Sequence, residues 1–375
     1  MTRWLLSLVL LAGLMALSAC AAEEKATPAP ASPTGATKPA WEQEWERVLA
    51  AAKQEGKVVV AGQEGAERRR ALTEPFEKKY GITVEHYGES GRTLAQRIRT
   101  EREAGQYLWD VFVGGGNTPL QVLAPIGALD PIESALILPE AKDPKNWFGG
   151  ILTFFDDQHM LINMFASKSP PIWFAPSVVK PGEITGFKDL LDPKWKGKIV
   201  ADDPTVTGAG RSKWRFMAVN RDLGPDYIRA LLKQDITFTR DEEQTLRSVV
   251  AGQYPVCIGC NDALATTMRK QGLAIEPLVP KEGIDITGGW GQVGLINKAP
   301  HPNAARVYIN WILGKEGQVA VAPTGPYASL RVDVPTGYLE PYAIPKPTDT
   351  LLNTDPRQRQ AEAIITPIFK EVLGR

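Results

Sequence analysis

Short apolar runs followed by glycine-rich turns recur in the first part of the chain. Val58 to Ala61 precedes Gly-Gln-Glu-Gly, Val84 to Tyr87 precedes Gly-Glu-Ser-Gly, and Trp109 to Val113 precedes three glycines and Asn117. Apolar residues at helical spacing follow the second of these turns. Repeated units of strand, glycine loop and helix are typical of open α/β sheets, whose ligands bind beyond the carboxyl ends of the strands. The pattern therefore predicts an α/β fold with several loops facing a ligand.

The same pattern returns near the middle of the chain. Lys198 to Ala201 is expected to be a buried strand, and Thr205 to Ser212 is a turn of small residues that opens a helix with Trp214 and Met217 on its apolar side. The first N–H groups of a helix have no partner within the helix, which suits an anion or a carboxylate. We expect this segment to form one wall of a ligand cleft.

The order of the segments predicts two lobes joined by two hinge crossings. Residues 41–160 are expected to form the first part of lobe 1 and residues 161–290 to form lobe 2. Residues 291–375 are expected to return to lobe 1 and to end in C-terminal helices. Such a layout places a ligand cleft between the lobes and permits closure about a ligand.

The first 40 residues are expected to stay outside the fold. Residues 1–20 have a basic start, an apolar stretch too short to span a bilayer comfortably, and Leu-Ser-Ala before Cys20. This resembles a bacterial lipoprotein signal, cleaved to leave Cys20 as the lipidated first residue; the alternative is an ordinary signal peptide cut at Ala19 or Ala22. Residues 21–40 are rich in Pro and Ala and predict a disordered tether. The protein is thus expected in the cell envelope, anchored by lipid on the outer face of the membrane or in the periplasm.

Composition and motifs argue against several classes of function. Lys plus Arg and Asp plus Glu both number 43, so the net charge is zero and nothing favours a nucleic-acid partner. The chain has no nucleophile elbow, no phosphate-binding loop of the Walker type and no H-E-x-x-H motif. We therefore predict a protein that is not an enzyme and has no catalytic residues.

Two cysteines lie close together beyond the signal segment. Cys257 and Cys260 form the sequence Cys-Ile-Gly-Cys. In an oxidising exterior they form either a small disulfide or two free thiols. Alone they make an incomplete zinc site, and the three histidines lie elsewhere in the sequence.

Several segments resemble a known family. The segments KWKGKIVADDPTVTGAG, VVAGQYPVCIG, APHPNAARVYINWILGKEGQ and LWDVFVGGG look like the ferric-iron-type extracellular solute-binding proteins of ATP-driven (ABC) importers, and the resemblance covers about residues 41–375. It implies a two-lobed periplasmic-binding-protein fold of type II. It also implies a monomer that binds a small molecule and works with a membrane permease and an ATPase.

The resemblance also shows where this chain departs from the family. Ferric binders of this kind hold iron with two neighbouring tyrosines, often with a His and a Glu, because hard oxygen ligands suit the cation. At the tyrosine position this chain has Cys260, Asn261 and Asp262, and at the His position it has Glu64. We therefore expect a small anionic solute, a carboxylate or a phosphorylated compound, and no certain cofactor. Ferric iron or a ferric chelate is the alternative; a cleft enzyme or a subunit of a membrane sensor are the others.

The predicted ligand-binding residues come from the glycine loops, the central turn and two aromatic positions. Arginines in two loops would grip an anion, and the aromatic residues would line the cleft. These residues are Gln63, Glu64, Ser90, Gly91, Arg92, Thr93, Gly115, Gly116, Asn117, Asp203, Thr205, Thr207, Gly208, Arg211, Trp290 and Tyr327.

Overall fold

The computed structural model describes residues 38–205, 209–346 and 357–374. The predicted signal peptide, Cys20 and all but the last three residues of the predicted tether lie outside the described residues, as do Thr207 and Gly208. The first helix of the described residues, α1, begins at Ala40.

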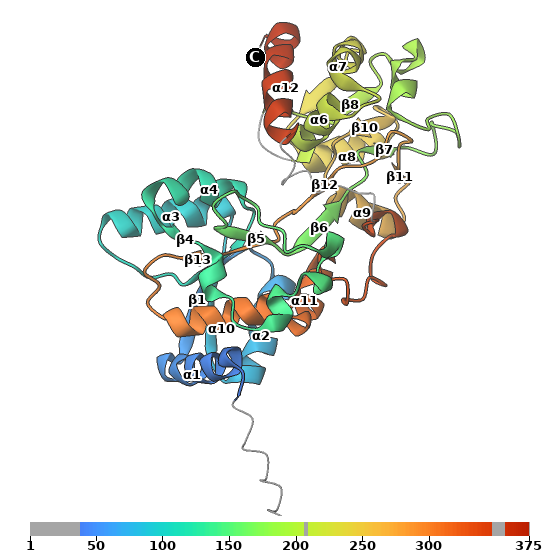
Figure 1. Ribbon diagram of the computed structural model, residues 1–375. Coiled ribbons are helices and arrows are strands. Elements are labelled where there is room, and N and C mark those ends of the chain that lie inside the picture. Colours follow the sequence, from blue (N-terminus) through green and yellow to red (C-terminus); the bar gives the residue numbers. More distant parts are fainter. Residues whose placement is uncertain (1–37, 206–208, 347–356, 375) are drawn as a thin grey trace, which may run out of the picture. The chain divides into compact units, whose positions relative to one another are not determined.

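The first sheet has the strand order β2-β1-β3-β13-β4, and β5 also pairs with β13. β1 runs parallel to β2 and β3, whereas β13 runs antiparallel to β3. The late strand β13 therefore brings the chain back beside the early strands (Figure 1). The bounds are β1 (Lys57–Gly62), β2 (Thr83–Gly88), β3 (Val111–Gly114), β4 (Leu129–Asp130), β5 (Leu161–Asn163) and β13 (Gln292–Ile296).

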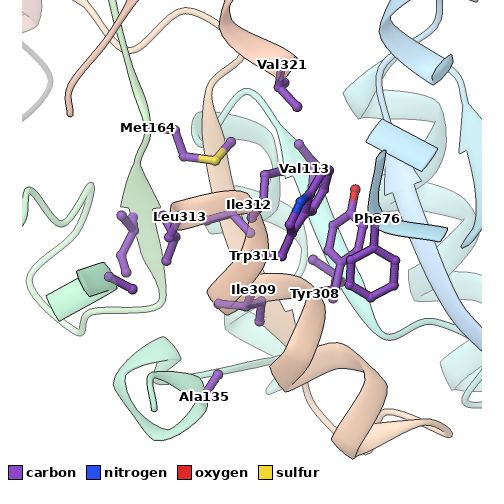
Figure 2. Close-up of a cluster of buried hydrophobic side chains, with 14 of the residues drawn as sticks. Phe76, Val113, Ala135, Met164, Tyr308, Ile309, Trp311, Ile312, Leu313 and Val321 are labelled. Carbon is purple, nitrogen blue, oxygen red and sulfur yellow. The ribbon is translucent and has the colours of Figure 1, made fainter. Parts of the chain in front are cut away.

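Helices cover this sheet and complete the first core. Helix α10 packs on α1 and contributes a nearly continuous buried surface. The ring of Phe76 lies 5.0 Å from that of Tyr308 and 5.4 Å from that of Trp311, centroid to centroid, and Figure 2 shows these side chains together. The helices are α1 (Ala40–Glu55), α2 (Ala66–Tyr80), α3 (Gly91–Glu103), α4 (Asn117–Val122), α5 (Pro139–Lys142), α10 (Pro302–Leu313) and α11 (Lys315–Val321).

The second sheet has the order β11-β7-β10-β8-β9 and its own core. The C-terminal helix α12 places Ile365 and Phe369 in this core, beside α6 and α7. The end of the chain thus packs on the second sheet, although β13 belongs to the first. The bounds are β7 (Ile172–Phe174), β8 (Ile199–Asp202), β9 (Thr237–Thr239), β10 (Val256–Ile258), β11 (Glu276–Leu278), α6 (Ala209–Val219), α7 (Gly224–Leu232), α8 (Glu242–Val250), α9 (Asp262–Lys270) and α12 (Arg357–Leu373).

A small antiparallel sheet, β12-β6-β14, lies where the chain passes between the two cores. Residues 288–291 separate β12 from β13. The glycines at 288, 289 and 291 bring the backbone against Asn163, Tyr327 and Phe165, where a side chain would collide. The strands are β6 (Phe165–Lys168), β12 (Ile286–Thr287) and β14 (Tyr327–Ser329).

Short 3-10 helices occupy many of the connections. The segment 187–191 is expected to be a short helix and is one of them, η5. They are η1 (Ala124–Ile126), η2 (Ile132–Ala135), η3 (Pro144–Asn146), η4 (Phe148–Gly150), η5 (Phe187–Leu191), η6 (Pro193–Trp195), η7 (Ala322–Thr324) and η8 (Pro341–Ala343). The exact domain boundaries stay predictions.

Candidate functional site

A polar pocket of about 350 Å³ is lined by elements of both cores. One part of its wall comes from α4, the small sheet and the segments beside it, with Asn117, Ser167, Ser169, Thr287, Gly289, Pro326 and Tyr327. The other part comes from α6 and from the start of α9, with Ser212, Lys213, Arg215, Cys260, Asn261, Asp262 and Ala263. Segments that lie far apart in the sequence therefore meet here.

Two helices of the second core turn their N-terminal ends toward the pocket. Ser212 and Lys213 lie in the first turns of α6, and Asn261 caps α9 by accepting a hydrogen bond from the Leu264 N–H at 3.0 Å. The Asn261 amide also donates to Glu242 at 2.7 Å, which fixes the cap. The positive ends of the two helix dipoles favour negative charge in this region.

A buried ion pair joins α6 to both segments that connect the two cores. The Lys213 ammonium lies 2.6 Å from an oxygen of Asp285, which precedes β12, and donates to the Ser169 carbonyl, which follows β6, at 3.2 Å. The exposed fractions of the two charged side chains are 5% and 0%. The charge of Lys213 is thus matched within the protein.

Two arginines on one face of α6 share the single carboxylate of Glu362. Arg211 binds it at 2.6 Å, whereas an Arg215 nitrogen lies 3.4 Å away. Burial lowers the pKa of the Arg215 guanidinium. Its Nε is buried and has no hydrogen-bond partner among the described residues. Arg215 thus brings a positive charge to the pocket that is only partly matched.

Asp262 is the first residue of α9 and is buried at the pocket wall. Burial raises the pKa of its carboxyl to about 6, although the Lys213 charge and a hydrogen bond from Tyr342 oppose the rise. The Oδ1 atom has no hydrogen-bond partner in the described part of the chain. Buried polar atoms without partners are rare in folded proteins, so this oxygen requires an explanation.

Aromatic rings pack behind the part of the wall that the small sheet and its neighbouring segments form. Trp290 is buried against Phe165 and Tyr327, with ring centroids 5.2 and 6.1 Å away, and the Arg68 guanidinium lies 4.4 Å from its ring centroid. Tyr327 lines the pocket itself, and burial raises the pKa of its phenol. Trp290 therefore supports Tyr327 from behind.

Comparison with known proteins identifies the family. Residues 71–343 match the family model described as bacterial extracellular solute-binding protein. The chain belongs to the bacterial extracellular solute-binding proteins. The family binds small-molecule solutes outside the cytoplasm for ABC importers, in agreement with the predicted family.

One curated relative and several solved structures are similar to this solute-binding protein. An uncharacterized protein of Haemophilus influenzae is 24% identical over 259 residues, which cover 66% of this chain and 69% of the relative. The periplasmic binding protein AfuA of Actinobacillus pleuropneumoniae, with fructose-6-phosphate bound, has a TM-score of 0.59 at 18% identity over 85% of this chain and 99% of its own. FutA of Trichodesmium, in complex with iron and citrate, has a TM-score of 0.64 at 19% identity over 84% and 99%. The predicted two-lobed, type II fold is confirmed.

Few of the predicted ligand residues lie in the lining of this pocket. Asn117 and Tyr327 line it. Cys260 also lines it. The sequence left a disulfide and two free thiols open for this cysteine, and the structure joins it to Cys257. Next to it, Gly259 has a φ of +73° and packs on Gly210 so closely that a side chain would collide with the backbone. The disulfide turn thus holds α6 and the start of α9 together.

The predicted loops of the first lobe make local contacts instead. Ser90 caps α3 by accepting a hydrogen bond from the Thr93 N–H at 3.2 Å, and the two hydroxyls lie 2.8 Å apart. The Gly116 N–H donates to Gln292 at 2.7 Å, and the Glu64 carbonyl accepts from Arg68 at 3.0 Å. The lining of this pocket does not include Gln63, Glu64, Ser90, Gly91, Arg92, Thr93, Gly115 and Gly116.

The described predicted residues of the central turn, Asp203, Thr205 and Arg211, bind other groups of the protein. Asp203 accepts hydrogen bonds from the N–H and hydroxyl of Thr205 at 2.9 and 2.6 Å and from Arg240 at 2.9 Å. Burial alone would raise the pKa of the Asp203 carboxyl, but these hydrogen bonds hold it below its usual range. Arg211 donates to the Pro204 carbonyl at 2.6 Å and holds Glu362, so it reinforces the turn.

Sequence reasoning missed most of the charged lining. Arg215 lies one turn beyond the nominated Arg211, on the same face of α6, so helical spacing was the available signal. Asp262 lies where the family resemblance places a ligand-binding tyrosine pair. That position was a signal that could have identified Asp262 as a lining residue. In residues 38–205, 209–346 and 357–374, no group of three or more His, Cys, Asp or Glu could hold a metal ion, and no helix is long and apolar enough to cross a membrane.

Proposed function

We propose that this solute-binding protein captures a small anionic solute, a carboxylate or a phosphorylated organic compound, in the pocket between α6, α9 and the small sheet. It then presents the solute, as a monomer, to the permease and ATPase of an importer. Lipidation at Cys20, outside the described residues, would hold it at the membrane, since each buried methylene contributes about 0.8 kcal/mol.

The observation that carries the proposal is the partly matched cation at the pocket wall. Arg211 and Arg215 share the carboxylate of Glu362, and Asp285, which also attracts Arg215, is bonded to Lys213 at 2.6 Å. The orphaned Nε of Arg215 is a donor that a carboxylate or phosphate oxygen would satisfy. The ends of α6 and α9 add about 0.3 to 1 kcal/mol each for a nearby anion.

The compared structures add a precedent for this class of ligand. AfuA holds fructose-6-phosphate and the Trichodesmium FutA holds citrate with iron, so the fold accommodates anionic organic compounds. Ferric iron is the alternative solute. Ferric iron would be coordinated by the phenolate of Tyr327, and burial of Tyr327 makes the phenolate form less favourable.

A thermal-shift screen tests the proposal. Carboxylates, phosphonates, sugar phosphates and ferric citrate are added to the purified protein, and a ligand at 100 times its Kd should stabilise the fold by about 2.7 kcal/mol. Arg215→Gln should weaken binding of the best anion about ten- to hundredfold, because it removes a charged hydrogen bond. Arg221→Gln, at a position whose side chain is 92% exposed, is the matched control.

The outcomes separate the alternatives. A screen in which no anion stabilises the protein would exclude the anionic solute. Equal binding of the best anion by the two arginine variants would exclude Arg215 from its binding site. A phenolate charge-transfer band with ferric citrate would favour iron, and chemical change of a bound compound would favour an enzyme. Binding without uptake in cells that carry the transporter would favour a sensor.

A further inference from the structure

Asp262 combines burial with an unused acceptor. Its exposed fraction is 9%, it lines the pocket, and its Oδ1 has no hydrogen-bond partner among the described residues. The Tyr342 hydroxyl donates to the same carboxylate, so the second acceptor position is the one left open. Leaving a buried acceptor unpaired is unfavourable, and more so for a charged group.

The surroundings hold this carboxylate in place. The hydrogen bonds of Asn261 fix the start of α9. The disulfide with Cys257 fixes Cys260, the residue before Asn261. A side chain on such a braced turn is positioned before any ligand arrives, which lowers the entropy lost on binding.

The neighbouring charges are already engaged. Lys213 attracts the Asp262 carboxylate, but its ammonium is bonded to Asp285 and Ser169. Glu340 repels the carboxylate, and so would Tyr327 if it were ionised. None of these groups donates a hydrogen bond to Oδ1, so a donor on a solute in the pocket that Asp262 lines would be its partner.

We propose that Asp262 accepts a hydrogen bond from the bound solute, which therefore carries a hydroxyl or ammonium group beside its anionic group. This inference rests on the proposed function. Arg215 would hold the anionic end and Asp262 would select the donor. A site built to bind a substrate donor discriminates strongly against an analogue without one, because its own polar group is then left unpaired.

Two pairs of probes test the inference, each matched in size and differing in the donor. 2-Aminoethylphosphonate is compared with propylphosphonate for the ammonium group, and citrate with tricarballylate for the hydroxyl group. Affinities are measured by calorimetry on the wild type, on Asp262→Asn, on Asp262→Ala and on Asp226→Asn. Asp226 lies in the first turn of α7 with its side chain fully exposed, so Asp226→Asn makes the same change of charge at a helix start away from the pocket.

The wild type should prefer the donor-bearing member of at least one pair by about ten- to hundredfold. Asp262→Ala should abolish that preference, and Asp226→Asn should keep it. Asp262→Asn should reduce the preference for ammonium more than that for hydroxyl, because the amide oxygen still accepts but carries no charge.

Failure of this inference differs from failure of the proposed function. If the probes bind but the members of each pair bind equally, or if the preference survives in Asp262→Ala, the role of Asp262 is wrong and the anionic class stands. If none of the four probes binds, the proposed class of solute and this inference fail together.

Discussion

The two lobes supply different chemistry to one pocket. The elements of the first core and the small sheet contribute neutral groups, such as the Asn117 amide and the Ser167 hydroxyl. In the described lining, the charged side chains Lys213, Arg215 and Asp262 all come from α6 and α9 of the second core. The selection of charge is thus concentrated on two helix starts, while the first lobe offers hydrogen bonds that suit many polar compounds.

The largest effect is expected at the ion pair that ties the second lobe to the passages between the lobes. Asp285→Ala would leave the Lys213 ammonium buried without its partner and should lower the free energy of unfolding by about 3 to 5 kcal/mol. Urea denaturation measures the change. Glu243→Ala breaks an exposed ion pair with Arg247 and should lower the free energy of unfolding by less than about 1 kcal/mol. Equal losses in the two variants would show that the buried pair does not brace the hinge.

The next effect concerns a buried base in the first lobe. His86 in β2 has an exposed fraction of 7%, and neither ring nitrogen has a partner among the described residues. Burial, with smaller effects of Arg69 and Arg68, lowers the pKa of His86 to about 4. Since the unfolded chain takes up a proton near pH 6.5 and the folded one does not, stability should be lost as the pH falls from about 7 to 4.

The difference of about 2.5 in the pKa of His86 corresponds to about 3 kcal/mol. His86→Leu removes this titration, so its stability relative to the wild type should rise as the pH falls. Urea denaturation at pH 4.5 and pH 7.5 tests this. A constant difference between the two proteins at both pH values would mean that His86 takes up its proton in the fold at the same pH as in the unfolded chain.

The sequence predicted the elements better than the site, for a physical reason. Short runs with buried apolar positions, ended by turn residues, indicated the strands β1, β2, β3 and β8, because burial on a sheet leaves a local pattern. The spacing of Cys257 and Cys260 left a disulfide and two free thiols open, and the structure has the disulfide. In contrast, the pocket depends on which of two arginines Glu362 engages, and that carboxylate lies about 150 residues away in α12.

Some of the predicted binding loops do not line the pocket, because their side chains form hydrogen bonds within their own segment. Ser90 and Asp203 have the residue types of binding loops, but both are used to cap a helix or to close a turn. Sequence alone does not separate an oxygen that serves its own backbone from one left open, as at Asp262. That distinction requires coordinates for both partners.

The smallest expected effect contrasts the acid of the second lobe with the base of the first. Burial raises the pKa of Asp262 from 3.8 to about 6, so its protonated form stabilises the fold, and this contribution is lost as the pH rises through about 6. Asp262→Asn should therefore raise the free energy of unfolding at pH 7.5 by about 2 kcal/mol, since about 3 kcal/mol of burial cost is removed and part of the Tyr342 hydrogen bond is lost. The gain should vanish below pH 4, opposite in direction to the effect of His86→Leu.

If Asp262→Asn is more stable at pH 7.5 but binds donor-bearing solutes less well, Asp262 contributes to binding and lowers the stability of the fold. A loss of stability at pH 7.5 would instead assign Asp262 a structural role at the start of α9.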